Sequence, residues 1–449
     1  MSFEWVTSSL LDHYEVRSGL SKPATDFGSG YPFLTFKDVF YNYFTPELLG
    51  DFVQATEKER EGCSILRGDV FLTRTSETMH ELGMSCVALR DYKDATFNGF
   101  CKRLRPKPDS DLLPEYVGYY LRSPRFRQAV SALSTMSTRA SLNNEMIGRL
   151  EISFPSRTAQ ARISKILKSL DDRITLLRET NTTLEAIAQA LFKSWFVDFD
   201  PVHAKAEGRQ PEGMDATTAA LFPDSFEESE QGLVPEGWRM STLGAICDAN
   251  GGAIQTGPFG SQLHASDYVA DGVPVVMPKD ISNRRIDAIT AARVGREDVQ
   301  RLARHQLRDG DIVFSRRGDV EKHALIGEAE RGWLCGTGCL LVRPGSRRNV
   351  AGFLSRSLDL PNIKKWLTQH AVGATMPNLN TGILSAVPVV LPTDEVLTAF
   401  DQAISVLDRR ISAGNAAAQT LTQLRDTLLP RLISGQLRLP ATTECKDAE

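Results

Sequence analysis

The chain has 449 residues, of which 41% are hydrophobic and 24% are charged; this is enough to bury more than one core and excludes a chain that is disordered throughout. A formal net charge of −4 excludes a protein that coats nucleic acid through an evenly basic surface, although basic clusters such as residues 102–107 still allow a confined contact. The lack of a run of ~20 apolar residues and of a basic, cleavable leader predicts a cytoplasmic protein without membrane contact, whose seven scattered cysteines stay reduced.

Most of the sequence consists of two similar copies. The residues Gly30, Pro32, Lys37 and Asp38 recur 242 positions later as Gly272, Pro274, Lys279 and Asp280. The same displacement relates GDVFLTR at 68–74 to GDIVFSR at 310–316. Later in each copy the displacement settles at 237, which pairs Leu170, Asp171 and Ile174 with Leu407, Asp408 and Ile411. A register kept over this length indicates a tandem duplication.

The first part of each copy, residues 1–155 and 238–392, predicts a compact α+β domain. Short apolar runs alternate with Gly, Pro and Asp, as is typical of many short strands joined by turns. The runs are YPFLTF, DVFLT and CVAL in the first copy, and VPVVM, DIVFS, CLLV and VPVVL in the second.

The second part of each copy predicts one long helix, at residues 156–198 and 393–437. Apolar residues recur there at spacings of three and four, which is the seam of a coiled coil in a helix ~55–60 Å long. The seam residues are Ile163, Leu167, Leu170, Ile174, Leu184, Leu191 and Trp195 in the first copy, and Phe400, Ile404, Leu407, Ile411, Leu421 and Leu428 in the second.

Two such seams are expected to pack on each other in antiparallel fashion, because the chain must return from one domain to the other and isolated helices gain little stability alone. The alternative is that each helix packs on its own domain. Asn181 interrupts the first seam, where a polar group can fix the register opposite small residues, or it faces solvent.

The two copies are joined by residues 199–237, which are rich in Pro, Gly and acidic residues and predict a linker without a core of its own. The last residues, 438–449, predict a polar tail.

Sequence patterns of catalysis are missing. The chain lacks a GxxxxGK[ST] loop, a Gly-rich nucleotide turn, an Asn-Pro-Pro-aromatic tetrad and an HExxH pair, so a non-catalytic protein is expected. Cys335 and Cys339 are the only close cysteine pair, and no second pair lies at zinc-like spacing; we therefore expect no metal site.

Two similar but unequal domains on a helical spacer are suited to contact two features at a fixed separation. Duplex DNA offers such features, since half-sites one helical turn apart lie ~34 Å from one another. The alternatives are a protein-interaction scaffold, which would account for the acidic net charge, and a nuclease with an unrecognised site.

The helical segments at 158–201 and 394–437 resemble the central and distal regions of the specificity (S) subunits of Type I restriction-modification systems. Three further motifs resemble the target-recognition domains of that family: GD[VI]-x-x-[TS]-R at 68–74 and 310–316, GWRMSTLG at 237–244 and GPFGS at 257–261. The resemblance covers nearly the whole chain, and WFVDFDPVHAKAEG is its most specific part.

The resemblance implies two pseudo-symmetric α+β target-recognition domains separated by an antiparallel coiled coil. Each domain would read one half of a bipartite, asymmetric target in double-stranded DNA. The helices would set the gap and dock two modification (methyltransferase) subunits, and two restriction (motor-nuclease) subunits would complete the complex. The chain itself would hold no cofactor, because S-adenosylmethionine, ATP and Mg would bind to the partner subunits.

Residues repeated in both domains are expected to make a contact that is common to both half-sites. Lys37, Arg74, Lys279 and Arg316 are therefore candidate phosphate contacts, with Arg317 beside them; alternatively, Arg74 and Arg316 pair with Asp69 and Asp311. Asn143 and Asn380 either contact DNA or cap the turn that follows. Bases are expected to be read by unrepeated polar residues, including those at 134–139 and 371–376.

Overall fold

The computed structural model describes residues 5–75, 81–134, 141–229, 232–287, 291–346, 349–373 and 375–439. The chain divides into two compact units, one formed by residues 1–177 and 416–449 and the other by residues 178–415. In the ranges given, no helix combines the length and the apolarity that a membrane span requires.

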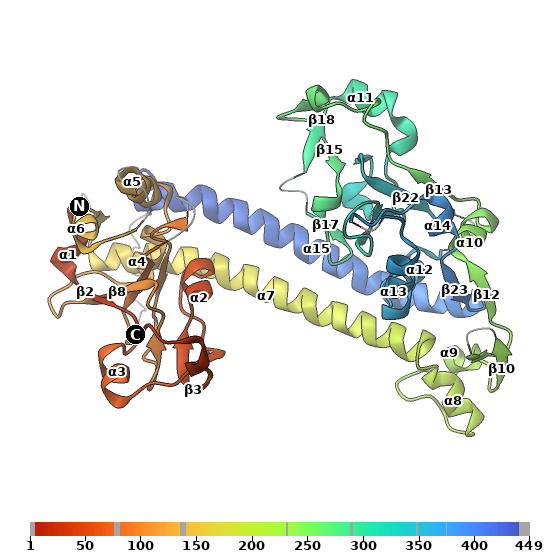
Figure 1. The fold of residues 1–449 in the computed structure, drawn as a ribbon, viewed down its shortest axis with the longest axis horizontal. Helices are drawn as coiled ribbons and strands as arrows, with labels where there is room; N and C mark the ends of the chain where they lie inside the picture. Colours follow the sequence, from red (N-terminus) through yellow and green to blue (C-terminus); the bar gives the residue numbers. More distant parts are fainter. Residues whose placement is uncertain are drawn as a thin grey trace, which may run out of the picture. The chain divides into compact units, whose positions relative to one another are not determined.

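The first unit is built from short strands and helices (Figure 1). Its strands are β1 (Val6–Ser9), β2 (Tyr14–Ser18), β3 (Phe27–Leu34), β4 (Asp51–Val53), β5 (Val70–Thr73), β6 (Ser85–Val87), β7 (Thr96–Phe97), β8 (Cys101–Pro106) and β9 (Glu151–Phe154). Its helices are α1 (Leu10–His13), η1 (Ala24–Asp26), α2 (Phe36–Tyr41), α3 (Glu57–Gly62), α4 (Pro114–Tyr120), α5 (Pro124–Ser134) and α6 (Asn144–Gly148).

The second unit contains a comparable set of elements. Its strands are β10 (Phe226–Ser229), β11 (Gly232–Pro235), β12 (Arg239–Thr242), β13 (Ala253–Thr256), β14 (Tyr268–Val269), β15 (Val273–Val276), β16 (Ile281–Ser282), β17 (Arg285–Ile286), β18 (Ala292–Val294), β19 (Ile312–Ser315), β20 (His323–Leu325), β21 (Leu334–Cys335), β22 (Cys339–Arg343) and β23 (Pro388–Leu391). Its helices are α8 (Asp200–Ala206), α9 (Ala216–Ala220), α10 (Leu243–Ala249), η3 (Ala265–Asp267), η4 (Pro278–Asp280), α11 (Arg296–Arg301), η5 (Ala303–His305), η6 (Glu328–Glu330), α12 (Ala351–Ser357), α13 (Pro361–His370) and α14 (Thr381–Ser385).

The sheets repeat between the units, which confirms the predicted pair of α+β domains. The order β2-β8-β5-β6 in the first unit matches β13-β22-β19-β20 in the second, and β1-β9 matches β12-β23. The sheet β4-β3-β7 matches β18-β15-β21, to which β14 is added. In both units a parallel pair joins the middle strand of this last sheet to its short neighbour, β3 to β7 and β15 to β21.

Two helices of 40 residues each, α7 (Arg157–Phe196) and α15 (Asp394–Ile433), contribute one half to each unit. Within a unit the two halves lie side by side and run in opposite directions (Figure 1). In the first unit Leu167 of α7 shares a core with Leu432 of α15, and in the second unit Phe196 shares a core with Phe400. The antiparallel coiled coil is therefore confirmed.

The seam residues also pack on the domains. Each helix therefore contacts both the other helix and a domain. In the first unit the core that holds Leu167 includes Leu72 of β5 and Tyr116 of α4. In the second unit the core that holds Phe400 includes Phe314 of β19 and Phe353 of α12. None of the predicted seam residues is exposed: each is buried or half-buried.

Asn181 lies inside the seam and not in solvent. Its Nδ2 donates to the backbone carbonyl of Ile411 at 3.1 Å and to Oδ1 of Asn415 at 2.7 Å. A Cβ atom on Gly414 would lie only 2.4 Å from Asn181 Oδ1, so the amide occupies the space that this glycine leaves open. Both its partners are on α15, and the amide therefore favours one register of the pair within the second unit.

The segment that joins the copies has more regular structure than its composition predicts. Between residues 199 and 237 it forms α8, α9 and the hairpin of β10 and β11. Val202 and Phe222 are buried in the same core as Trp238 and Phe196. These apolar residues of the segment therefore belong to the core of the second unit. The predicted tail is described only to residue 439.

Candidate nucleic-acid interface

The repeated GD motif forms the same turn and strand in both units. Gly68 and Gly310 have φ values of +92° and +83°, in the left-handed region that favours glycine. Asp69 accepts a hydrogen bond from the Leu66 amide at 2.8 Å, and Asp311 accepts one from the Arg308 amide at 2.8 Å. The apolar strands that follow, β5 and β19, are fully buried in the middle of their sheets.

Arg74 and Arg316 come directly after these strands and occupy equivalent positions. The Arg74 amide donates to the Phe100 carbonyl at 2.7 Å, and the Arg316 amide donates to the Gly338 carbonyl at 2.8 Å. On the other side, the carbonyls of the two arginines accept from Leu142 and Leu379 at 2.8 and 2.9 Å. Both backbones are therefore held from two sides, and both side chains are half-buried.

The alternative in which Arg74 and Arg316 pair with Asp69 and Asp311 is wrong. Asp69 instead receives a two-pronged contact from Arg105, with Nε at 2.8 Å and Nη2 at 2.6 Å. Asp311 receives the same contact from Arg343, again at 2.8 and 2.6 Å. These aspartates are buried, and a fork-shaped guanidinium on the neighbouring strand satisfies both oxygens better than a side chain beyond the strand end.

Asn143 and Asn380 cap helices. Asn143 Oδ1 accepts from the Met146 amide at 2.8 Å at the start of α6, and Asn380 Oδ1 accepts from the Ile383 amide at 2.8 Å at the start of α14. This explains their repetition, because asparagine is a favoured residue at this position. A DNA contact of either side chain stays a prediction.

Lys37 of α2 and Lys279 of η4 are exposed at equivalent positions of the repeat. The aspartate that follows each lysine is the structural member of the repeated pair: Asp38 accepts from the Thr35 amide and Asp280 from the Met277 amide, both at 2.9 Å. Lys279 Nζ lies 2.8 Å from Asp280 Oδ1. The role of both lysines in DNA binding stays a prediction.

In the second unit Pro377 and Asn378 lie on the turn that carries Arg316 and Arg317. Arg317 is exposed and its backbone pairs with Asn378. The Gly318 amide donates to the Pro377 carbonyl at 3.0 Å. Two predicted base-reading segments are thereby only partly placed, because residues 135–139 and residue 374 are outside the described ranges.

In the first unit Lys102, the first residue of the basic cluster at 102–107, lies beside Arg74. Its Nζ donates to Ser18 Oγ at 3.0 Å and to Asn144 Oδ1 at 3.1 Å. Burial and the nearby Arg74 charge lower the pKa of Lys102. The strand ends of the first unit thus bring together two cationic side chains, which suits an anionic ligand.

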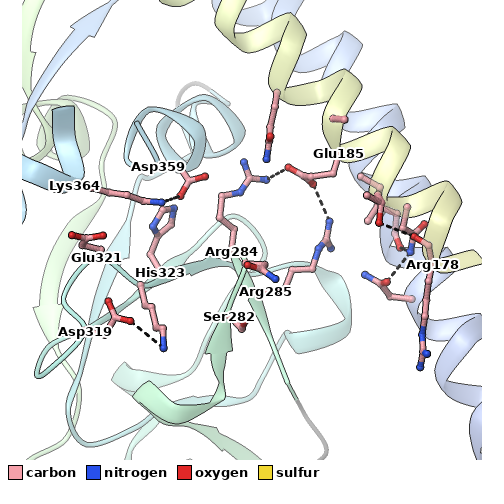
Figure 2. A pocket seen from close by; sticks show the side chains of 18 residues that line it. Arg178, Glu185, Ser282, Arg284, Arg285, Asp319, Glu321, His323, Asp359 and Lys364 are labelled. Atoms are coloured by element: carbon pink, nitrogen blue, oxygen red, sulfur yellow. Dashed lines mark hydrogen bonds and ion pairs between the residues drawn. The ribbon is translucent and has the colours of Figure 1, made fainter. Parts of the chain in front are cut away.

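A second charged region, in the second unit, links the domain to α7 (Figure 2). Glu185 of α7 faces Arg284 Nη2 at 3.0 Å and Arg285 Nη2 at 3.4 Å. The hollow beside them, of about 750 Å³, is lined by both signs of charge, and Lys322 pairs with Asp319 and Lys364 with Asp359. These internal ion pairs favour a structural role for the hollow over anion binding.

No cluster of three or more His, Cys, Asp or Glu side chains suited to a metal ion occurs in the part of the chain that the structure describes. Cys335 and Cys339 are both buried in the apolar core of the second unit. The predictions of no metal and of no cofactor in this chain stay predictions.

Two α+β units of one design, each with an arginine at the end of a buried strand, define a protein built from a duplicated module. The family model for the Type I restriction modification DNA specificity domain matches residues 4–186 and 235–414. The chain therefore belongs to this family, as a DNA-recognition subunit of the Type I restriction-modification class and not a catalytic one.

Individual relatives agree with this assignment. The chain is 27% identical over 373 residues to the Type I restriction enzyme HindI specificity subunit of Haemophilus influenzae. The aligned region covers 74% of this chain and 79% of that protein. It is 24% identical over 443 residues to the MjaIX specificity subunit of Methanocaldococcus jannaschii, with 97% and 94% covered. The crystal structure of the Type I S subunit from M. genitalium shares the fold, with a TM-score of 0.60, 15% identity and 98% of both chains covered.

Proposed function

We propose that the chain reads a bipartite, asymmetric target in duplex DNA, with one half-site for each unit. The observation that carries this is the duplicated strand end: Arg74 and Arg316 are held by equivalent backbone hydrogen bonds, whereas the loops around them differ between the units. A shared arginine suits the phosphate backbone, which both half-sites have in common, and unlike loops suit unlike base sequences.

The proposal is tested by mapping methylated positions in DNA from cells that express the chain with its modification partner. One bipartite motif is expected. The purified complex should then bind a duplex with that motif far more tightly than a scrambled duplex at about 0.15 M salt, where non-specific binding is weak. Equal affinity for both duplexes would reject DNA specificity and favour the protein-interaction scaffold.

Two modification subunits are proposed to dock on the helices, with two restriction subunits joining the complex. Ile187 of α7 and Leu424 of α15 stand 237 positions apart, at equivalent places in the repeat, and their side chains are 50% and 45% exposed. One apolar residue of this kind on each helix fits two copies of one partner, because exposed apolar groups at equivalent places are suited to equivalent contacts. The partners would supply S-adenosylmethionine, ATP and Mg chemistry.

Native mass spectrometry of the reconstituted complex tests the docking. Ile187→Asp and Leu424→Asp should each lower the number of bound modification subunits from two to one, since a charge placed in an apolar contact is costly. Val406→Asp is the matched control: Val406 is also an exposed residue of α15, but its equivalent, Ser169, is polar. Loss of both partners in every variant, the control included, would place the contact elsewhere.

A further inference from the structure

Each unit exposes one phenylalanine at its strand-end arginine. Phe100 is 60% exposed and Phe259 is 52% exposed. A single exposed apolar side chain is ordinary on a protein surface, so exposure alone carries no conclusion. The position of the two rings does.

Both phenylalanines are neighbours of the repeated arginines, Phe100 through its backbone and Phe259 through its ring. In the first unit the Phe100 carbonyl is the acceptor for the Arg74 amide, at 2.7 Å. In the second unit the Phe259 ring centre is 6.0 Å from Cζ of Arg316. Each recognition unit thus combines a cation and a flat apolar group at the same strand end.

The two rings come from different loops that are neighbours in both units. Phe100 precedes β8, and the equivalent residue before β22 is Gly338, whose carbonyl binds Arg316 in the same way. Phe259 lies in the loop after β13. The equivalent loop of the first unit follows β2 and contains Ser21. A Cβ on Gly99 would lie 2.2 Å from Ser21 Oγ, and a Cβ on Gly257 would lie 2.1 Å from the Gly336 carbonyl, so the loops touch in each unit. Each unit therefore has one exposed phenylalanine on this pair of touching loops, although the two residues do not align in the repeat.

The backbone under each ring is held by a side-chain amide. The Phe100 amide donates to Asn98 Oδ1 at 2.8 Å, and the Phe259 amide donates to Gln262 Oε1 at 3.1 Å. Such local hydrogen bonds hold each loop in one conformation, which reduces the entropic cost when the ring meets a ligand.

The charges beside the rings select the kind of ligand. Lys102 accompanies Arg74 in the first unit, and the exposed Arg317 accompanies Arg316 in the second. Cations with an exposed aromatic ring fit a polyanion that also offers flat apolar faces, and the bases of duplex DNA provide such faces where a step is unstacked.

We infer that Phe100 and Phe259 each wedge against a base step of their own half-site, while Arg74 and Arg316 hold the adjacent phosphates. This inference rests on the proposed function and names specificity-determining residues for it. Because the rings enter from different loops, they meet the two half-sites in different orientations and favour different base steps.

The test uses the full chain with its modification partner and the target found by methylation mapping. Phe100→Ala and Phe259→Ala should each weaken binding to the target about tenfold, because each variant loses one stacking contact with a base. The affinity for a scrambled duplex should stay unchanged. Phe100→Trp and Phe259→Trp should restore most of the affinity. Phe52→Ala, an exposed ring in the separate sheet β4-β3-β7, is the matched control and should bind as the original chain does.

A fluorescent 2-aminopurine placed at successive positions of one half-site should brighten on binding at one step, and that signal should disappear only with the alanine variant of the corresponding unit. Unchanged affinity and fluorescence in both alanine variants, with target discrimination intact in the original chain, would overturn this inference and leave the proposed function standing. Equal losses on target and scrambled duplex would also overturn it. If the original chain does not discriminate, the proposed function fails, and this inference with it.

Discussion

The Tyr119 hydroxyl donates a hydrogen bond to Oδ2 of Asp171 at 2.7 Å, which joins α4 of the first domain to α7. The equivalent pair in the second unit, 237 positions later, is Arg356 and Asp408, with Nη2 at 2.8 Å from Oδ1. The aspartate is therefore kept in both copies as the link between a domain and the helix that follows it. Its partner has changed from a neutral donor to a charged one.

This difference predicts unequal costs when the links are removed. Tyr119→Phe should lower the free energy of unfolding by about 1 kcal/mol, because Asp171 keeps its second partner, with Arg425 Nη1 at 2.7 Å. Asp408→Ala should cost about 3–5 kcal/mol, since Arg356 is 2% exposed and would be left as a buried charge without this carboxylate. Urea unfolding followed by circular dichroism measures both.

Asp172→Ala is the control for these two variants. Asp172 forms an exposed ion pair with Lys168 at 2.6 Å, and exposed pairs contribute little. A cost for Asp408→Ala no larger than that of this control would contradict the assigned role of the buried link.

The close approach of Asn181 to Gly414 predicts that the effect of Gly414→Ala on the free energy of unfolding changes sign when Asn181 is removed. Gly414→Ala should destabilise the chain by about 1–3 kcal/mol, because the new Cβ would lie 2.4 Å from Asn181 Oδ1. In an Asn181→Ala background the same change should stabilise by up to about 1 kcal/mol, the ordinary gain of alanine over glycine in a helix. A double-mutant cycle measured by urea unfolding tests this, and additive effects would show that the two residues do not interact.

Features that depend on periodicity could be predicted from the sequence. The seam at spacings of three and four identified both long helices, and the equivalence of Arg74 and Arg316 followed from a constant displacement in the repeat. The partner of Asp69 could not be predicted, because Arg105 lies 36 positions away and reaches it only through the pairing of β5 with β8. A sequence gives the order of strands along the chain but not which strand ends face one another.

The exposed rings of Phe100 and Phe259 show a different limit. Comparison of the copies finds residues that align, and these two do not, because each lies on a different loop. Conversely, the alignment of Asn143 with Asn380 marked a shared local structure, a helix cap, which repeats for reasons of folding whether or not DNA is bound. Repetition alone therefore does not separate a functional residue from a structural one.

His323 predicts an acid-sensitive second unit. Its ring stacks on Phe314, Nε2 bonds the Ser355 carbonyl at 2.9 Å, and burial lowers its pKa below the usual 6.5. Burial outweighs the hydrogen bond to Ser355 and the charge of Asp359, which raise this pKa, and the charge of Arg284 lowers it further. An unfolded histidine takes up a proton near pH 6.5 and the folded one does not, so stability is complete above that pH and falls below it.

Comparison with His323→Gln isolates this effect. Between pH 7.5 and 5.5 the unfolding free energy of the original chain should fall more steeply than that of the variant, by up to about 1.4 kcal/mol per pH unit. His305, whose pKa is lowered to about 4, acts in the same direction in both proteins and cancels. Tryptophan fluorescence reports the transition, since Trp195, Trp238, Trp333 and Trp366 all belong to the second unit. Parallel slopes would exclude His323 as the cause.

If the helices set the gap between the half-sites, as the family resemblance implies, then lengthening them should change the target. Seven residues inserted after Leu177, with seven more after Asn415, keep both seams in phase and lengthen each helix by about 10 Å. Both insertions lie at the boundary between the units, so the hydrogen bond of Asn181 with Asn415 is kept. Methylation mapping should then find the same two half-sites with a longer gap, by about three base pairs. An unchanged gap, in a complex that still methylates, would refute the spacer role.

Neutralising the shared arginines should weaken binding without changing the sequence that is read. Arg74→Gln and Arg316→Gln each remove one cation that is proposed to bind a phosphate, so affinity should fall several-fold for target and scrambled duplex alike. The slope of log K against log salt should also become shallower by about 0.9 for each phosphate that is no longer neutralised. Arg209→Gln, which removes a surface arginine paired with Glu207 in the segment between the copies, is the control for the change in net charge. Weaker binding confined to the target duplex would mean that these arginines read bases, because only a base-reading side chain distinguishes one sequence from another.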